Sequence, residues 1–258
     1  MPSSDNRGKL FIVGIGPGST EQCTGRAKDA IRESEIIIGN DFYLRLIEDL
    51  TAGKEVITSS MGKEVERARA CVDLAKEKRV CMVSGGDPGI YGMASIVLEV
   101  LEHDGASIDY EVVPGVTAAT AAASLVGSPL SGDYVTLSLS DLLTPWEMIE
   151  HRMDCAFAMG VPVAVYNPKS RGRPDNLAQA LAAALRYRDG DTPVAVVKNA
   201  FRESQEVRFF TLQSLVADDS YVDMRSIVII GGEGSRIGTV GDREMMITPR
   251  GYDRKYIY

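Results

Sequence analysis

The sequence VSGGDPGIYG (Val83–Gly92) joins an apolar strand, Val80–Val83, to a helical pattern that runs from Ile90 to Glu102. A strand-to-helix turn with this much glycine lets the main chain approach a ligand closely, because no Cβ lies in the way. Open α/β sheets bind ligands at such turns, beyond the carboxyl ends of the strands. Asp87 adds an acceptor beside exposed backbone groups, which suits a cationic or zwitterionic ligand better than a phosphate. The turn is therefore predicted to bind a ligand such as an amino acid or a sulfonium.

Strand and helix patterns alternate along the first half of the chain. Strands are predicted at 9–14, 35–38, 55–58, 80–83 and 108–113, and helices at 21–33, 41–50, 63–78 and 90–102. This alternation is typical of crossover units around a mainly parallel sheet. The fold class predicted for the chain is α/β.

The texture of the sequence changes after Pro114-Gly115, where a small-residue helix is predicted at 116–125. Further strands are predicted at 134–139, 161–166, 193–197, 207–212, 225–230, 236–240 and 245–248, and helices at 145–159 and 176–186. Thr144 is the predicted N-cap of the first of these helices, with Pro145 at its first position. The segment Met153–Gly160 fits either a helix or a loop. A length of 258 residues suits two domains, which we place at 1–115 and 116–258, the second with a mixed sheet.

Charge and composition limit the partners and the compartment. The net charge of −8 argues against a nucleic-acid partner. No apolar run reaches the length of a membrane span, and the first residues lack an apolar signal region, so nothing predicts export. The four cysteines are far apart and without Cys-x-x-Cys spacing, which indicates reduced thiols in the cytoplasm. The two histidines, His103 and His151, have no ligand-like neighbours, so no metal site is expected.

A second glycine loop, Gly14-Ile15-Gly16-Pro17-Gly18, follows the first predicted strand. The Gly-x-Gly spacing is found in dinucleotide-binding proteins, and Asp41 could be the acid that contacts the ribose. Pro17 argues against this, because it removes an N–H donor where a pyrophosphate needs one. The loop is thus a simple turn, a dinucleotide site, or a loop that lines a cleft for another ligand.

Two polar stretches in the second half could carry chemistry. Lys169, Arg171 and Arg173 follow a strand end, and they form either a solvated charged face or a clamp for carboxylates, which guanidinium groups bind bidentately. Ser140 and Asp141 gather at another strand end, where they could bind by hydrogen bonds or transfer protons. No histidine lies nearby to activate a serine, so a Ser-His-Asp hydrolase is disfavoured.

In this order, the loops resemble the tetrapyrrole methylases, a class of two-domain methyltransferases that use S-adenosylmethionine. The resemblance is carried by VGIGPG (13–18), SGGDPGIYGMA (84–94), VPGVTAATAAASLVGSPL (113–130) and the strand end YNP (166–168). Four stretches are similar to one branch, the precorrin-3B C-17 methyltransferases and their cobalt-pathway counterparts: SLSDLLTPW (138–146), YNPKSRGR (166–173), VVKNA (196–200) and MITPRGY (246–252).

The resemblance implies two α/β domains with the active cleft between them, a homodimer, and S-adenosyl-L-methionine as cofactor, released as S-adenosyl-L-homocysteine. The residues that it implies for the cofactor are Gly86, Asp87, Ile90, Thr117, Ala118, Asn167, Ala200 and Ile227. For the tetrapyrrole they are Gly16, Pro17 and Gly18, with Lys169, Arg171, Arg173 and Arg250 as our candidates to hold its carboxylates.

The implied reaction methylates C-17 of a precorrin-3B-type tetrapyrrole and contracts the ring, a step of cobalamin biosynthesis. Contraction needs an acid or a base, and Ser140, Asp141 or Lys198 is predicted in this role because of its place at a strand end. The substrate is either metal-free or cobalt-containing, since its metal needs no protein ligand. Two other hypotheses stay open here: an NAD(P)-dependent oxidoreductase that uses Gly14-Ile15-Gly16, and a non-catalytic tetrapyrrole carrier.

Overall fold

The computed structural model describes residues 8–60 and 62–257. The chain divides into two compact units, Met1–Ala118 and Ala119–Tyr258. The expectation that the chain begins without an export signal falls largely on residues 1–7, outside the described residues. Within the described ranges, no helix has the length and apolar character needed to cross a membrane.

The first unit is built on a parallel sheet of five strands in the order β3-β2-β4-β1-β5. Its strands are β1 (Lys9–Gly14), β2 (Ile36–Asn40), β3 (Glu55–Ser59), β4 (Arg79–Ser84) and β5 (Asp109–Val113). Strands β1, β2 and β4 are almost wholly buried, which explains their unbroken apolar runs. The predicted α/β class is confirmed, and β1 lies between the two strands whose loops matter most, β4 and β5.

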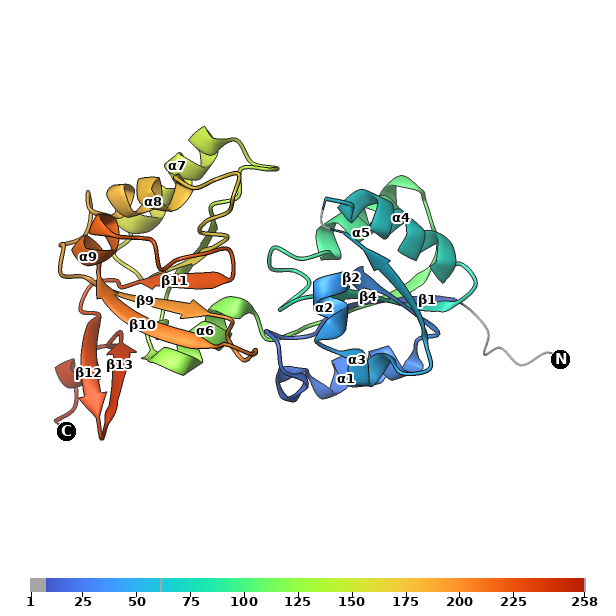
Figure 1. Cartoon of the computed structure of the whole chain (residues 1–258), viewed down its shortest axis with the longest axis horizontal. Coiled ribbons are helices and arrows are strands. Elements are labelled where there is room, and N and C mark those ends of the chain that lie inside the picture. Colours follow the sequence, from blue (N-terminus) through green and yellow to red (C-terminus); the bar gives the residue numbers. More distant parts are fainter. Residues whose placement is uncertain (1–7, 61, 258) are drawn as a thin grey trace. The chain divides into compact units, whose positions relative to one another are not determined.

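Helices cover both faces of this sheet (Figure 1). They are η1 (Thr20–Gln22), α1 (Gly25–Glu33), α2 (Asp41–Arg45), α3 (Glu48–Thr51), α4 (Glu64–Ala75) and α5 (Ala94–His103). Ile12 and Met82 belong to the core under α4 and α5, whereas Phe11 and Val83 belong to the core under α1. Successive residues of a strand point to opposite faces, so each buried strand serves both cores.

Three predicted helices of this unit begin late or break. The helix predicted from residue 21 starts at Gly25, because the hydroxyl of Thr24 caps it by accepting from the N–H of Ala27 (3.1 Å). The helix predicted at 41–50 divides into α2 and α3, since the fully buried Ile47 has φ −126° and ψ 23°, outside the helical range. The helix predicted from Ile90 starts at Ala94, after a turn in which Tyr91 has φ +52°.

The second unit contains a mixed sheet in the order β10-β9-β11-β8-β7. Its strands are β7 (Val135–Ser138), β8 (Val163–Tyr166), β9 (Pro193–Lys198), β10 (Glu206–Thr211) and β11 (Ser226–Ile230). Strand β7 is parallel to β8, and β11 is antiparallel to both of its neighbours. The carboxyl ends of β7, β8 and β9 therefore lie at the same end of the sheet. A smaller sheet joins β12 (Arg236–Val240), β13 (Arg243–Ile247) and the short β6 (Gly127–Ser128).

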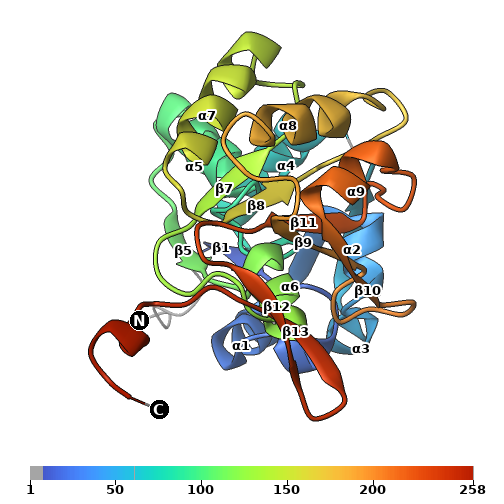
Figure 2. The same ribbon diagram turned by 90° about the vertical axis from the view of Figure 1, so that its left-hand side faces the viewer.

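Figures 1 and 2 both show α7 (Trp146–Ala158), α8 (Asn176–Ala184) and α9 (Leu212–Ala217) on one face of the mixed sheet and α6 (Ala118–Val126) on the other. A short helix, η2 (Tyr252–Arg254), follows the last strand. Phe157, Leu181 and Ile230 are fully buried in the core between the sheet and the first three helices.

The helices of this unit differ from the prediction at two places. Helix α7 begins after Pro145, so Thr144 is not its N-cap. It runs to Ala158, so the ambiguous segment Met153–Gly160 is helix except for its last two residues. Helix α9 and strand β6 were not predicted. The strand predicted through Leu212 ends at Thr211, whose hydroxyl accepts from the N–H of Ser214 (3.1 Å) and starts α9.

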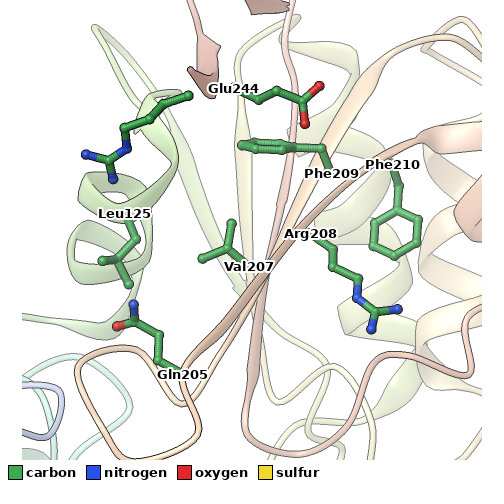
Figure 3. A pocket seen from close by; sticks show the side chains of 8 residues that line it. Leu125, Gln205, Val207, Arg208, Phe209, Phe210 and Glu244 are labelled. Atoms are coloured by element: carbon green, nitrogen blue, oxygen red, sulfur yellow. The ribbon is translucent and has the colours of Figure 1, made fainter. Parts of the chain in front are cut away.

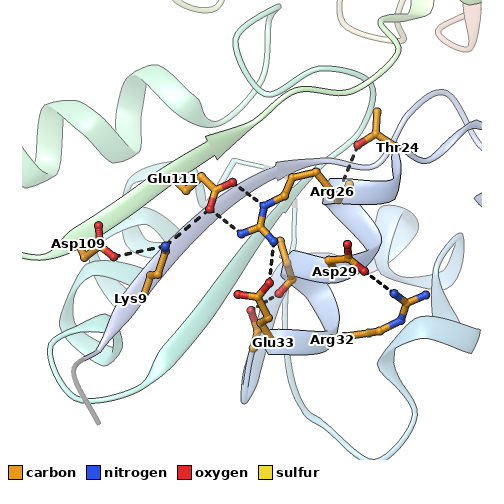
Figure 4. A network of polar contacts seen from close by, with 11 residues as sticks. Lys9, Thr24, Arg26, Asp29, Arg32, Glu33, Asp109 and Glu111 are labelled. Carbon is orange, nitrogen blue, oxygen red and sulfur yellow. Dashed lines mark hydrogen bonds and ion pairs between the residues drawn. The ribbon is translucent and has the colours of Figure 1, made fainter. Parts of the chain in front are cut away.

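A polar network ties β1, β5 and α1 together at the surface of the first unit (Figure 4). Both carboxylate oxygens of Glu111 accept hydrogen bonds from Arg26, each at 2.6 Å, and Lys9 lies 3.6 Å away. Hydrogen bonds from Arg26 hold the pKa of Glu111 below its usual value. Because the folded pKa is lowered, this pair stabilises the fold above the pKa of an unfolded glutamate, and the contribution is lost as the pH falls through the folded pKa.

We expect Glu111→Gln to lower the free energy of unfolding at pH 7 by about 0.5–1 kcal/mol, the range for a partly solvent-screened ion pair. At pH 3, below the unfolded pKa of about 4.3, the difference from the native chain should shrink. Urea unfolding at both pH values measures it. Glu102→Gln, at an exposed position of α5, is the control and should change little. An equal loss at both pH values would contradict the linkage.

Candidate active site

Three loops meet at the carboxyl ends of β1, β4 and β5. The N–H of Gly16 donates to the carbonyl of Gly86 (3.1 Å), and the N–H of Gly86 donates to the carbonyl of Gly16 (2.8 Å). The N–H of Ile15 donates to the carbonyl of Ser84 (3.0 Å). The two glycine loops singled out in the sequence are therefore joined to each other as a short antiparallel bridge.

Glycine is required where these loops touch. A Cβ on Gly14 would lie 2.6 Å from the carbonyl oxygen of Gly86, and one on Gly115 would overlap the same oxygen. Gly16 and Gly86 have φ of +78° and +68°, which side chains rarely allow. The nearest atoms to a Cβ on Gly86 belong to Thr117 and Ala118, at 3.7 Å. The structure thus brings together three of the predicted cofactor residues, at the start of α6.

Asp87 braces the turn that it belongs to. One carboxylate oxygen accepts from the N–H of Gly89 (2.8 Å) and the other from the N–H of Gly115 (3.0 Å). The carboxylate forms none of the ion pairs found among the described residues. Because each oxygen can accept more than one hydrogen bond, the group is anchored and still able to face a positive charge.

The other residues predicted in this unit differ in exposure. Ile90 is exposed, whereas Gly16, Pro17 and Gly18 are buried. Sequence reasoning missed Arg67 of α4, whose side chain is 3% exposed. It donates to the hydroxyl of Ser59 (2.7 Å) and lies 3.5 Å from the sulfur of Met93, the residue before α5. Arg67 therefore links the carboxyl end of β3 to the residue that follows the glycine turn. Nothing in its sequence surroundings separates it from the other charged residues of its helix.

In the second unit, Arg173 joins the residues predicted to be catalytic. Its Nη1 donates to the hydroxyl of Ser140 (2.7 Å) and lies 3.3 Å from the carboxylate of Asp141, and its Nε donates to the hydroxyl of Ser170 (3.1 Å). The Arg173 side chain is 21% exposed. The loop after β7 and the loop after β8 are therefore fastened together by one guanidinium group.

The remaining predicted cations are placed differently. Lys169 is paired with the carboxylate of Asp219 (2.6 Å), so much of its charge is already balanced. Arg171 and Arg250 are exposed and form no ion pair within the described part of the chain.

Lys198 lies apart from Ser140 and Asp141. It ends β9, which is three strand spacings from β7 in the sheet, about 14 Å. Its ammonium is 4.1 Å from the ring centroid of Tyr221 and 3.6 Å from the carboxylate of Asp223, and its side chain is 15% exposed. The three predicted catalytic residues thus form two separate groups, and one proton-transfer site cannot include all of them.

The ring of Tyr221 is in contact with two cations. Arg208 lies 4.0 Å from the centroid of the ring that Lys198 contacts, and the Tyr221 hydroxyl donates to Glu206 (3.1 Å). Burial and the bond to Glu206 raise the pKa of Tyr221 to about 12. The phenol therefore stays protonated at neutral pH and serves as a stacking surface.

The predicted adenosine residues lie at the end of the mixed sheet where β8 and β9 finish and the antiparallel β11 begins. Asn167 follows β8 with φ +49° and donates to the hydroxyl of Ser138 (2.9 Å). Ala200 follows β9, and Ile227 pairs with Val197 in the antiparallel β11. Left-handed backbone in residues other than glycine is often found at functional sites.

The same left-handed backbone recurs on both sides of Ala200. Asn199 has φ +48° and Phe201 has φ +57°, and neither was singled out in the sequence. Asparagine tolerates the left-handed conformation. The asparagines that follow β8 and β9, Asn167 and Asn199, were therefore the only sequence signal for this backbone.

Comparison with known proteins places these features in context. A model of the tetrapyrrole (corrin/porphyrin) methylases matches residues 9–216. Over 94% of its length the chain is 41% identical to a probable cobalt-factor III C(17)-methyltransferase of Salmonella typhimurium, of which it covers 99%. The chain spans about half the length, 54% and 46%, of two longer curated relatives. The resemblance seen in the loop motifs is confirmed.

Solved structures agree with the fold. The crystal structure of the methyltransferase CobJ matches with a TM-score of 0.86 and 30% identity, over 94% of this chain and 100% of that one. A uroporphyrin-III C-methyltransferase of Thermus thermophilus, solved with S-adenosylhomocysteine, matches with a TM-score of 0.67 over 87% of this chain and 92% of that one. Its identity of 22% shows likeness of fold alone.

The oxidoreductase hypothesis is not supported by these likenesses, and the first glycine loop explains why. The N–H of Gly16 is already used by Gly86, so it cannot donate to a pyrophosphate. The helix α1 begins only at Gly25, after η1, and therefore does not present its N-terminus directly after the strand. Asp41 is paired with Arg45.

Proposed function

The chain belongs to the tetrapyrrole methylases, and from this membership we propose that it methylates C-17 of a precorrin-3B-type tetrapyrrole and contracts the ring, in cobalamin biosynthesis. The substrate is the metal-free compound or its cobalt-containing form. The observation that carries the proposal is the junction of the two glycine loops with an anchored carboxylate at Asp87, which has no ion pair among the described residues.

The residues fit S-adenosyl-L-methionine, which supplies an electrophilic methyl group on a positively charged sulfur. Asp87 offers negative charge without a competing cation among the described residues, and Gly86 leaves room for close approach beside Thr117 and Ala118. We assign Ile90 to the same methionine end, and Asn167, Ala200 and Ile227 to the adenosine. These residues bind and orient the donor, and orientation is the main requirement of methyl transfer.

Binding of the substrate falls to the cations of the second unit. Arg173 is pre-oriented by Ser140 and Asp141. Arg171 and Arg250 are exposed and have no ion pair with the described residues, so both can pair with carboxylates of the tetrapyrrole. Lys169 contributes less, because Asp219 already balances it. Gly16, Pro17 and Gly18 are buried, so any contact they make with the ring is through the main chain.

The proton transfer of ring contraction is assigned to the Ser140 and Asp141 group. The Ser140 hydroxyl accepts a hydrogen bond from Arg173, so the proton of that hydroxyl points away from the guanidinium. The carboxylate of Asp141 contacts the same Nη1 of Arg173. Lys198 is committed to Tyr221 and Asp223, so we expect it to be less important for contraction. Asp141→Asn should then slow contraction more than methylation.

Calorimetry tests the proposal directly. S-adenosyl-L-homocysteine should bind the native chain, and NADP should not. Binding of NADP alone would favour the oxidoreductase hypothesis, and binding of a tetrapyrrole without the sulfur nucleoside would favour the carrier. Anaerobic assays with the metal-free and the cobalt-containing substrate then identify which form is methylated.

We also propose that the protein works as a homodimer in the cytoplasm, without a nucleic-acid partner. All four cysteines are free, which suits a reducing compartment. Strand β10 is an edge strand beside a pocket of about 540 Å³ (Figure 3). The pocket is lined by Gln205, residues 207–210, Leu125, Arg243 and Glu244. An open edge of this kind can pair with a second copy. Light scattering should give twice the chain mass, and the monomer mass would contradict it.

A further inference from the structure

Two adjacent leucines stand in solvent at the tip of the loop between β7 and α7. The exposed fraction of Leu142 is 76%, and that of Leu143 is 98%. Single exposed apolar residues are common on protein surfaces, but two neighbours this exposed present a continuous apolar tip. They contribute nothing to the core of the second unit, so the fold itself does not explain them.

The loop is held firmly on both sides of these leucines. Arg173 fastens Ser140 and Asp141, and the side chain of Asn176 donates to the carbonyl of Leu139 (2.8 Å). On the other side Trp146 packs against the core where α7 begins. The leucines are therefore presented on a fixed base, which reduces the entropy lost when a ligand covers them.

Positive charge lies beside this apolar tip. The guanidinium that fastens the loop belongs to Arg173, and Arg171 is exposed two residues earlier in the chain. Asp141, 3.3 Å from Arg173, is one carboxylate beside two arginines, and the Arg171 side chain has no ion pair within the described residues, so a net positive charge is left over. A ligand that matches both features has an apolar surface edged by carboxylates.

We propose that Leu142 and Leu143 pack against the macrocycle of the tetrapyrrole while Arg171 and Arg173 bind its carboxylates. The proposal rests on the proposed function, because it assigns these leucines to that substrate. A tetrapyrrole ring is a broad apolar surface with carboxylate side chains at its rim, which is the combination that this loop pair presents. The leucines supply affinity for the ring, and the arginines supply orientation.

The test is the double variant Leu142→Ser/Leu143→Ser. Because both side chains lie in solvent, the melting temperature should not fall. Uroporphyrin III, a stable polycarboxylate macrocycle, is the binding probe, and quenching of its fluorescence should show an affinity about 30-fold weaker. With the natural substrate, KM should rise while kcat changes little. Affinity for S-adenosyl-L-homocysteine should stay unchanged. Val240→Ser, at a similarly exposed position of β12, is the matched control and should leave uroporphyrin binding intact.

Three results would separate the possibilities. Unchanged uroporphyrin affinity and KM in the double variant would overturn the inference. A shift of the double variant to lower mass in light scattering, with unchanged uroporphyrin affinity, would show that a second copy covers the leucines and would also overturn it. Failure of the native chain to bind S-adenosyl-L-homocysteine would instead overturn the proposed function, whatever the leucines do.

Discussion

Gly115→Ala is expected to abolish binding of S-adenosyl-L-homocysteine and to lower the free energy of unfolding by about 1–3 kcal/mol, the usual cost of overpacking. The new Cβ would overlap the carbonyl oxygen of Gly86 and lie 2.8 Å from that of Gly14. Both atoms belong to the backbone of neighbouring loops, so no side chain can move aside. The substitution would also displace the N–H of Gly115, which donates a hydrogen bond to the carboxylate of Asp87.

Calorimetry with S-adenosyl-L-homocysteine and urea unfolding measure the two effects. Gly25→Ala is the matched control, because a Cβ there meets nothing within 4 Å and the residue begins α1. Alanine at that helical position should keep the affinity and raise stability by up to about 1 kcal/mol. Native affinity in Gly115→Ala would show that the junction of the loops does not shape the cofactor site.

Arg173→Met should lower kcat/KM for the tetrapyrrole about 100-fold, which corresponds to about 2.7 kcal/mol. The change removes the guanidinium that we propose binds a substrate carboxylate, and it also frees Ser140 and Asp141 from their common donor. Arg173→Lys should recover part of the loss, because it restores the charge without the planar fork. Steady-state assays under anaerobic conditions measure these effects.

Arg171→Met is the comparison for this prediction. Arg171 is exposed and makes no ion pair among the described residues, so its loss should cost about tenfold or less. Affinity for S-adenosyl-L-homocysteine should be native in both variants. If the two arginines proved equally important, pre-orientation by Ser140 and Asp141 would have no role in substrate binding.

The sequence predicted those features that local pattern determines. The alternation of strands with helices predicted a mainly parallel sheet, because strands joined through helices run in the same direction. The unbroken apolar runs of β1, β2 and β4 agree with their burial on both faces of that sheet. The glycines of the turn at Val83–Gly92 predicted that the main chain can approach a ligand closely. Helix α9 was missed although its signal is local, because the apolar residues of β10 run directly into Leu212.

Features that depend on distant partners could not be predicted. The pairing of Gly16 with Gly86 and the bond from Gly115 to Asp87 join loops that only the order of the strands brings together. The separation of Lys198 from Ser140 follows from the sheet order, which places β11 and β8 between their strands. The residue type at a strand end indicates a candidate site residue, but the order of the strands in the sheet determines which other side chains lie near it.

The bridge between Gly16 and Gly86 has a consequence for transplanting this site. The turn at Gly85–Gly92 depends on the backbone hydrogen bonds with Gly16 in one loop and on the N–H of Gly115 in another. A designer who copies the turn alone into another parallel sheet would copy a segment that lacks its supports. The site can be transferred only as a set of three loops on adjacent strands. For the same reason, a substitution in one of these loops would need matching substitutions in the other two.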